Sequence, residues 1–333
     1  MIDLSSTMLG MRGCVGKSVR QISNLLDFPA IVLLYHRIAD LEFDPQQLAV
    51  SFQNFYQHME YLKKVYHILT IDEFQESITK RKPFLSRSLI LTFDDGYADN
   101  AQQALPVLES LNVQALFYIS TANIGSRQEF WWDDLERIFL QDRQPPPELK
   151  LSVDGRMYSF STQNFEARRL VYFTLHPIVK KQKPEIREQI FQQLCVWAGV
   201  PREGRETHRT MMTTDIQKMS KSKSAVIGAH THNHVSLSML SYQEQFDEIQ
   251  KSKLVLENLT GQKINHFSYP YGAREDYDRQ SIRIVKELDF TMASANFYWQ
   301  VHRWSDIYQI PRIVVRNWGI EEFKQHLKGF YLS

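Results

Sequence analysis

The sequence is poor in cysteine, since its 333 residues include only Cys14 and Cys195. Neither belongs to a CxxC pair, and two distant cysteines do not make the disulfide framework of a small secreted domain. This scarcity excludes a disulfide-rich scaffold and a cysteine knuckle for zinc, and it allows a reducing compartment. Either cysteine can serve as a small buried hydrophobe.

Net charge and long apolar runs are lacking as well. Lys and Arg number 39 against 38 Asp and Glu, so the formal charge is +1 and no overall attraction to nucleic acid is expected. No apolar run approaches the roughly 20 residues of a membrane-spanning helix, and the first residues lack an apolar stretch of secretory type. We therefore expect a cytoplasmic protein without a transmembrane segment. No feature indicates an oligomeric state.

Residues 1–27 are interpreted as an N-terminal arm. Residues 4–26 can form an amphipathic helix with Lys17 and Arg20 on its polar side, which would allow peripheral contact with the inner face of a membrane. The alternative that we favour is a helix packed against the end of the main domain.

From residue 28 onward, short uncharged runs of aliphatic and β-branched residues alternate with amphipathic stretches. Such runs are typical of strands buried on both faces of a parallel sheet. They lie at Ala30–Tyr35, Ser88–Phe93, Ala115–Ile119, Ala225–Ala229 and 310–315, with helical patterns at 51–65, 98–111, 241–259 and 280–288. This alternation predicts an α/β fold with a parallel sheet that is closed or nearly closed.

One stretch, residues 126–222, breaks this alternation. It is rich in Arg, Lys, Gln and Glu, contains three successive prolines at 145–147, and has helical patterns around 166–179 and 184–197. We interpret it as a mostly helical insertion that interrupts a barrel formed by residues 28–333. Because it separates two motifs described below, we expect its base at the catalytic rim and hypothesise that it selects the substrate.

The sharpest motif, TFDDGY at 92–97, follows the strand Ser88–Phe93. It delivers Asp94 and Asp95 into a turn at Gly96, and active sites of α/β folds gather at such strand ends. Neighbouring strand residues point to opposite sides, so the two aspartates can have different roles. Taken alone, an ordinary Asp-Gly turn is the more frequent explanation.

A second motif, HTHNH at 230–234, follows the strand Ala225–Ala229. Imidazoles four residues apart in a helical turn project to one side, so His230 and His234 can hold one cation while His232 points elsewhere. Two neutral imidazoles, one carboxylate and an open position form a catalytic arrangement for zinc and related divalent metals. The alternative is a histidine-rich loop that is exposed to solvent or hydrogen-bonded in the core. The aspartate pair elsewhere in the sequence disfavours this alternative.

A third motif, FSYPYG at 267–272, ends a strand in a turn that can present a backbone N–H and an aromatic wall. With the strand LLYHRI at 33–38, the ordered motifs resemble the polysaccharide deacetylase family, also called the NodB-homology domain or carbohydrate esterase family four. The resemblance covers residues 30–330 except the insertion. It implies a distorted (β/α) barrel with fewer than the eight complete units of a full barrel.

The resemblance also implies roles for individual residues. Asp94 would be the catalytic base, and the backbone N–H of Tyr271 would help to bind the oxyanion. Asp95, His230 and His234 would hold the metal, for which we expect Zn²⁺, with Co²⁺ or another divalent ion as the alternative. This assignment suits amide hydrolysis, because a metal activates water and polarises the carbonyl while a free carboxylate accepts the proton.

The sequence departs from the family pattern in two places. Many members carry an arginine that orients the base before the Pro-aromatic turn, where this chain has Ser268 and Tyr269. Arg312 is our candidate substitute, with an ordinary ion pair as the equal alternative. Many members also end with a Leu-x-His general acid, which has no clean match here. His302 is the candidate acid, although an ordinary loop histidine is more frequent, and His326 is expected on the surface.

Four further side chains are expected to contact the substrate. Tyr97 and Pro270 belong to the motifs, Trp132 can stack on a sugar ring, and His36 lies at the end of the first strand. Packing in the core is the equal alternative for Trp132 and His36.

These features predict a metal-dependent hydrolase whose partner is a carbohydrate. It would remove an N-acetyl group from an amino sugar of a nucleotide-linked, lipid-linked or polymeric glycan in envelope or exopolysaccharide biosynthesis. Deformylation of a lipid-linked amino sugar is one alternative, because the chemistry is the same. A carbohydrate-binding barrel with little or no turnover is the other.

Overall fold

The computed structural model describes residues 27–142 and 144–332. The expected N-terminal arm and its membrane contact therefore lie outside the described residues, apart from Asp27. Among the described residues, no helix combines the length and the apolar character needed to cross a bilayer.

The centre of the molecule is one parallel sheet with the strand order β11-β10-β9-β6-β5-β1-β12, to which β4 adds beside β5. The strands are β1 (Ala30–Tyr35), β4 (His67–Ile68), β5 (Ser88–Phe93), β6 (Ala115–Ile119), β9 (Ala225–Ala229), β10 (His266–Ser268), β11 (Met292–Ser294) and β12 (Ile313–Val314). Two short strands outside this sheet, β2 (Arg37–Ile38) and β3 (Ala49–Val50), pair with each other.

The two edges of this sheet approach one another through a single segment. Ile310 forms a bridge with Ser294 on β11, whereas Ile313 on β12 pairs with Leu33 on β1. The segment between them contains Pro311, which cannot donate a backbone hydrogen bond, so only a short strand forms. The sheet therefore curls into a nearly closed barrel, which confirms the predicted fold class.

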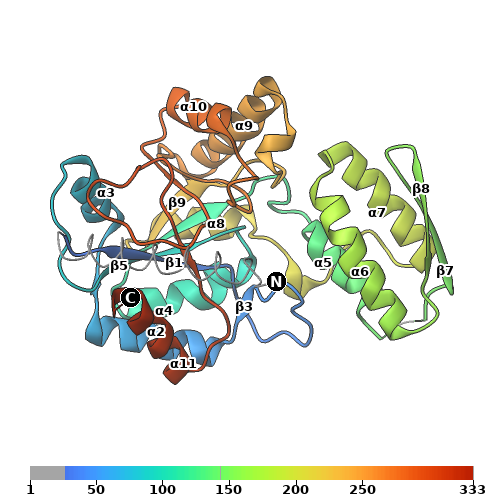
Figure 1. Ribbon diagram of the computed structural model, residues 1–333, viewed down its shortest axis with the longest axis horizontal. Helices are drawn as coiled ribbons and strands as arrows, with labels where there is room; N and C mark the ends of the chain where they lie inside the picture. Colours follow the sequence, from blue (N-terminus) through green and yellow to red (C-terminus); the bar gives the residue numbers. More distant parts are fainter. Residues whose placement is uncertain (1–26, 143, 333) are drawn as a thin grey trace, which may run out of the picture.

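Helices cover the outside of this barrel (Figure 1). They are α2 (Phe52–Val65), α3 (Ile71–Thr79), α4 (Leu105–Ser110) with the π-helical turn Asn100–Ala104 before it, α8 (Thr213–Met219), α9 (Tyr242–Thr260), α10 (Arg279–Glu287) and α11 (Ile320–Leu332). Their ends carry ordinary capping signals. In α9, for example, the Ser241 hydroxyl accepts from the Glu244 amide, and Gly261 ends the helix with a φ of 67°.

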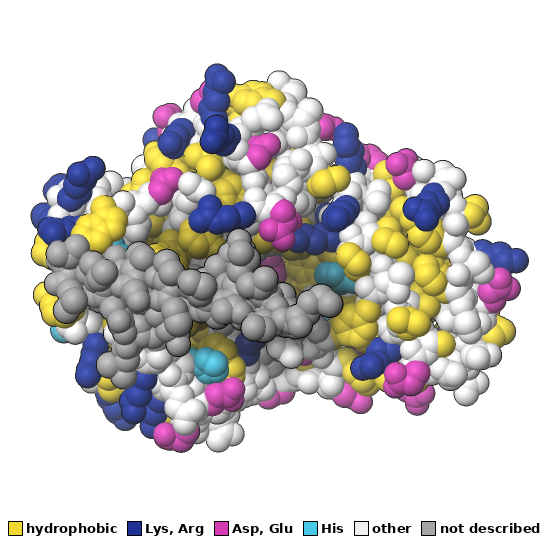
Figure 2. Space-filling view, viewed as in Figure 1, with side chains coloured by type: hydrophobic (Ala, Val, Ile, Leu, Met, Phe, Trp, Pro, Cys, Tyr) yellow, Lys and Arg dark blue, Asp and Glu magenta, His cyan; other side chains and the backbone are white. Residues whose placement is uncertain are grey.

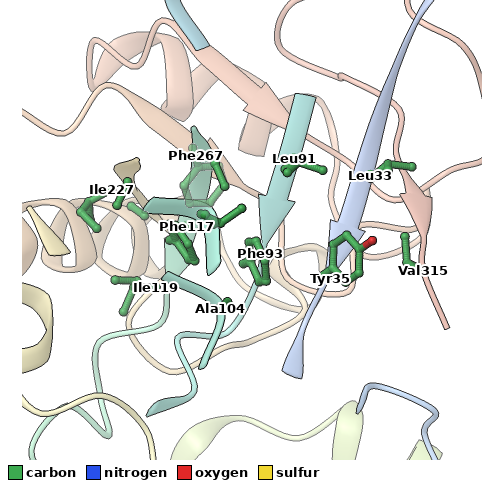
Figure 3. Close-up of a cluster of buried hydrophobic side chains, with 14 of the residues drawn as sticks. Leu33, Tyr35, Leu91, Phe93, Ala104, Phe117, Ile119, Ile227, Phe267 and Val315 are labelled. Carbon is green, nitrogen blue, oxygen red and sulfur yellow. The ribbon is translucent and has the colours of Figure 1, made fainter. Parts of the chain in front are cut away.

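Alternate strand residues pack into two separate cores. Leu33, Leu91 and Phe117 belong to the core that includes the covering helices, and Figure 3 shows them on adjacent strands. Val32 and Ile90 belong to a second core, on the inner side of the barrel, that also contains residues of α3, β11 and the closing segment. The period-two alternation then directs Asp94, which lies four residues after Ile90, toward the interior.

Residues between β6 and α8 form a separate lobe beside the barrel, at the right in Figure 1. Its elements are α5 (Trp131–Phe139), the antiparallel hairpin of β7 (Glu148–Val153) and β8 (Arg156–Ser161), α6 (Phe165–Lys180) and α7 (Pro184–Ala198). Apart from Tyr97, the buried residues of its core run from Phe130 to Val200.

This lobe core is narrower than the insertion expected at 126–222. The Met211 amide donates to the Gly96 carbonyl at 3.0 Å, and Met211, Ile216 and Met219 are buried in the barrel core. Charged composition predicted the wider limits, but it does not distinguish a lobe from a covering helix of the barrel. The hairpin was not expected either, although Asp154-Gly155 between two alternating runs is a signal for it.

We predict that the lobe depends on its own apolar core. Replacing Leu175, which is fully buried, by alanine should lower the free energy of lobe unfolding by about 2–5 kcal/mol. Leu170 lies on the same helix and is 69% exposed, so Leu170→Ala should change it by less than about 0.5 kcal/mol. Urea unfolding followed by tryptophan fluorescence gives both values, and equal effects would contradict this packing.

Candidate active site

Asp95, His230 and His234 converge beyond the ends of β5 and β9. Their potential ligand atoms all lie within 4.8 Å of one another, and all three residues are buried. One Asp95 oxygen lies 3.5 Å from Nε2 of His230 and 3.2 Å from Nε2 of His234. His232 points away, and its Nδ1 lies 2.8 Å from the Thr121 hydroxyl. Three side chains from two motifs thus face one point.

The chemistry of these groups fits a divalent metal. His230 Nδ1 lies 2.8 Å from the Ser268 carbonyl, which can only accept, so Nδ1 carries the proton and Nε2 keeps a lone pair. Burial lowers the pKa of His234 to about 4, which favours the neutral imidazole. Burial also opposes ionisation of Asp95, but the adjacent imidazoles of His230 and His234 outweigh it and lower the pKa of that carboxyl. Two neutral imidazoles and one carboxylate suit zinc or a similar ion.

The backbone at this site is strained. Asp95, Thr231, His234 and Tyr271 have φ values of 76°, 58°, 47° and 60°, in the left-handed region that disfavours residues other than glycine. Each such residue costs on the order of 1–3 kcal/mol and persists only where its surroundings hold it. Gly96 adopts 86°, and a Cβ there would lie 2.7 Å from Ile119 Cγ2. These left-handed conformations turn the chain sharply, so that the side chains of the aspartate and histidine motifs face one pocket.

Asp94 is held beside this cluster by a buried arginine. The two terminal nitrogens of Arg312 donate to the two oxygens of Asp94, each at 2.7 Å, and Arg312 is only 2% exposed. Burial raises the pKa of Asp94, but the charge and hydrogen bonds of Arg312 together with the nearby imidazoles outweigh it, so the pKa is lowered. Arg312 also donates to the Ser268 hydroxyl at 2.8 Å. Ser268, which precedes the Pro-aromatic turn where many family members have an arginine, therefore contacts an arginine from the segment that closes the barrel.

A cavity of about 200 Å³ opens onto these residues. Its lining includes His36, Trp132 and Tyr271, as the sequence predicts for substrate contacts and the oxyanion turn. Figure 2 shows the surface hollowed between the barrel and the lobe. Six lining residues were missed by sequence reasoning: Gln46, Leu48, His176, Asn296, Val314 and Arg316. Position just after a strand could have indicated Asn296 and Arg316, whereas His176 lies on a lobe helix without any motif.

Tyr97 and Pro270 do not line this cavity, so the expected substrate contacts are wrong for both. Tyr97 is fully buried, and its hydroxyl donates to Asp133 at 2.6 Å and accepts from Trp132 Nε1 at 2.8 Å. Trp132 in turn packs edge-on against His234, with ring centroids 4.8 Å apart. Tyr97 thus fixes the orientation of Trp132, which lines the cavity. Pro270 is buried.

The structure also overturns His302 as the general acid. Its neighbour Val301 pairs with Ala30 at the start of β1, whereas His36 follows the end of that strand. Six strand residues at roughly 3.3 Å each separate the two ends by about 20 Å. His302 stacks on Trp304 at 4.9 Å instead. His326, expected on the surface, has a half-exposed side chain.

Comparison with known proteins agrees with this geometry. The sequence model of the family described as polysaccharide deacetylase matches residues 81–144 and 199–293. These matched residues form a domain of the polysaccharide deacetylase family. A curated relative, YxkH of Bacillus subtilis (strain 168), is named after the polysaccharide deacetylases and is 30% identical over 108 residues. That match covers 32% of this chain and 37% of the relative's length.

Two solved structures share the deacetylase fold. The deacetylase PplD of Streptococcus pyogenes, in complex with acetate, has a TM-score of 0.58 at 16% identity and covers 90% of this chain and 98% of its own. IcaB from Ammonifex degensii has a TM-score of 0.59 at 16% identity and covers 92% of this chain and 98% of its own. At these identities the likeness shows the fold alone.

The deacetylase family model leaves residues 145–198 unmatched, and these form most of the lobe. This part nevertheless supports the shared site. Arg187 on α7 is buried and donates to the carbonyls of Val179 and Lys180 and to that of His234 at 3.1 Å. Lys180 forms an ion pair with Asp276 at 2.8 Å. The lobe therefore holds the strained backbone of one candidate metal ligand.

We predict that Arg187 influences the metal affinity of the Asp95, His230 and His234 cluster. Arg187→Gln should weaken Zn²⁺ or Co²⁺ binding by about 10–100-fold, because the carbonyl of the ligand residue loses its partner. Arg187→Lys should recover part of the loss. Arg169→Gln, on the exposed face of α6, is the matched control. Titration with Co²⁺ followed by visible absorption measures this, and wild-type affinity in Arg187→Gln with intact circular dichroism would contradict it.

Proposed function

We propose that this chain is a metal-dependent N-deacetylase of an amino sugar in a glycan or glycan precursor. The observation that carries the proposal is Asp94, a buried carboxylate held by Arg312 immediately beside the cluster of Asp95, His230 and His234. A barrel that only binds carbohydrate has no need for this costly arrangement.

When bound by Asp95, His230 and His234, a divalent ion would lower the pKa of a water molecule and polarise the acyl carbonyl. Asp94 accepts the proton of the attacking water. Arg312 keeps both carboxylate oxygens oriented through its two parallel hydrogen bonds. Since Asp94 lies only 3.7 Å from His230 Nε2, the base is close to the point at which the three ligands converge.

The turn at Tyr271 supplies a donor for the oxyanion. The left-handed φ of Tyr271 turns the chain sharply, and the next amide, of Gly272, donates to the Pro270 carbonyl. Within the described residues, the Tyr271 amide itself donates to no backbone carbonyl. A single donor of this kind stabilises the transition state by on the order of 3 kcal/mol.

His36 is the proposed proton donor to the leaving amine, in place of His302. It lines the cavity directly after β1, where the Asp94 amide donates to the neighbouring Tyr35 carbonyl at 3.0 Å. Its Nδ1 is buried without a hydrogen-bond partner among the described residues. This nitrogen is therefore not committed to the protein.

The lobe side of the cavity suits a sugar. Trp132 offers an aromatic face for the apolar side of a pyranose, and His176 adds a polar group from α6. We propose an N-acetylated amino sugar in envelope or exopolysaccharide biosynthesis, with Zn²⁺ as the metal and the cytoplasm as the location. The deacetylase PplD, whose structure holds acetate, shares this fold and supports the acetyl group.

We expect Asp94→Asn to keep the metal and lose the reaction. Without the base, kcat should fall by about 10²–10⁴-fold, while the metal ligands are untouched. Acetate and formate release from a panel of N-acyl amino sugars, together with metal content, measures this. Turnover at the wild-type rate in Asp94→Asn would sink the proposed mechanism, and no release by the wild type would favour a binding protein.

Replacing the two uncommitted cavity histidines separately should identify the proton donor. His36→Gln should lower kcat by about 10²–10⁴-fold. His176→Gln should act mainly on KM, because this ring packs against Trp131 on the lobe side at 4.7 Å. Steady-state kinetics of both variants decides, and the reverse pattern would assign the proton donor to His176.

A further inference from the structure

Arg316 is a cation of the catalytic cavity whose charge has no carboxylate partner. It follows β12 and lines the cavity with Asp94 and Asp95. Its Nη1 donates to the backbone carbonyls of Gln46, at 3.0 Å, and Gln47. Among the described residues, these two carbonyls are its hydrogen-bond acceptors, and no acid forms an ion pair with it.

The acid that acts on this guanidinium is already engaged. Asp44 is the carboxylate whose charge raises the pKa of Arg316, against the larger opposing effect of burial. Its two oxygens accept from the amides of Leu48 and Ala49, at 2.9 and 2.8 Å, and hold the loop beside the cavity. Asp44 therefore shapes the loop, and it acts on the charge of Arg316 without forming an ion pair with it.

The other cations around the site are committed. Arg312 forms its two hydrogen bonds with Asp94, and Lys180 forms an ion pair with Asp276. Arg187 does not line the cavity, and its guanidinium donates to backbone carbonyls, including that of His234. Arg316 thus places one positive charge in the cavity wall that forms no ion pair among the described residues, where partial burial makes a charged hydrogen bond stronger than in water.

We propose that Arg316 binds an anionic substituent, a phosphate or diphosphate group, on the amino-sugar substrate. A guanidinium presents several N–H groups in a planar fork that matches phosphate oxygens, and one nitrogen remains fixed by the two carbonyls. The polar side chains of Gln46 and Asn296 line the same cavity and can complete the binding of such a group. This inference rests on the proposed deacetylase function and narrows its substrate to a sugar phosphate.

Two substrates that differ only in charge test this inference. Wild-type enzyme should have a lower KM for N-acetylglucosamine 1-phosphate than for the neutral methyl glycoside. Arg316→Gln should raise the KM ratio of phosphate to neutral substrate by about 10-fold or more, as expected for a charged hydrogen bond. Arg316→Lys should recover part of the preference, and Arg279→Gln, exposed at the start of α10, should leave it unchanged. An unaltered KM ratio in Arg316→Gln would overturn the proposal.

The source of the phosphate is a separate arm of the same experiment. Nucleotide-diphosphate-linked and polyprenyl-diphosphate-linked N-acetylglucosamine are compared in wild type and Arg316→Gln. An increase in KM for either one supports the site and identifies its natural substrate class, whereas an increase for neither contradicts it. If the wild type releases acetate from no substrate, the deacetylase proposal fails. Calorimetric binding of N-acetylglucosamine 1-phosphate to the same two proteins then tests Arg316 alone, and equal affinities refute it.

Discussion

Two adjacent buried carboxylates dominate the electrostatics of this molecule. Asp94 and Asp95 repel each other, and neither can stay ionised in the interior without its own positive partner. Arg312 serves Asp94, and its arrival requires the closing segment that joins β11 to β1. The imidazoles of His230 and His234 face Asp95, and a divalent ion held by the three side chains would supply its positive partner. The closure of the barrel and the position of the histidine loop therefore both serve to stabilise the two buried carboxylates.

The strained backbone shows how the fold meets this requirement and what the lobe adds. Left-handed residues lie in each of the three motif loops, and hydrogen bonds from neighbouring segments hold them. The Ser120 amide donates to the Asp95 carbonyl, and Arg187 of the lobe donates to that of His234. Trp132 and His176 come from the lobe to form one wall of the cavity. The lobe is thus part of the site, although the family model does not match most of its residues.

Sequence reasoning reached the strands and motifs because their signals are local. Uncharged runs that are followed directly by acids or histidines predict a parallel sheet with a site at the ends of its strands. Asp94 and His234 lie at those strand ends. Arg312 was only a candidate, because its contact with Asp94 depends on how the barrel closes. Tyr97 and His302 failed for the same reason, since a motif does not say which way a tyrosine packs or at which end a loop lies. His176 reaches the cavity only because the lobe packs against the barrel, and no local sequence motif indicates such a contact.

The central claim is that Asp95, His230 and His234 hold one divalent cation beside Asp94. A crystal structure of the zinc-loaded protein with anomalous scattering data at the zinc edge tests it most directly. The account predicts one strong peak about 2.0–2.2 Å from an Asp95 oxygen and from Nε2 of both histidines, and its loss in Asp95→Ala. A peak bound by other residues, or one that persists unchanged in Asp95→Ala, would contradict the account.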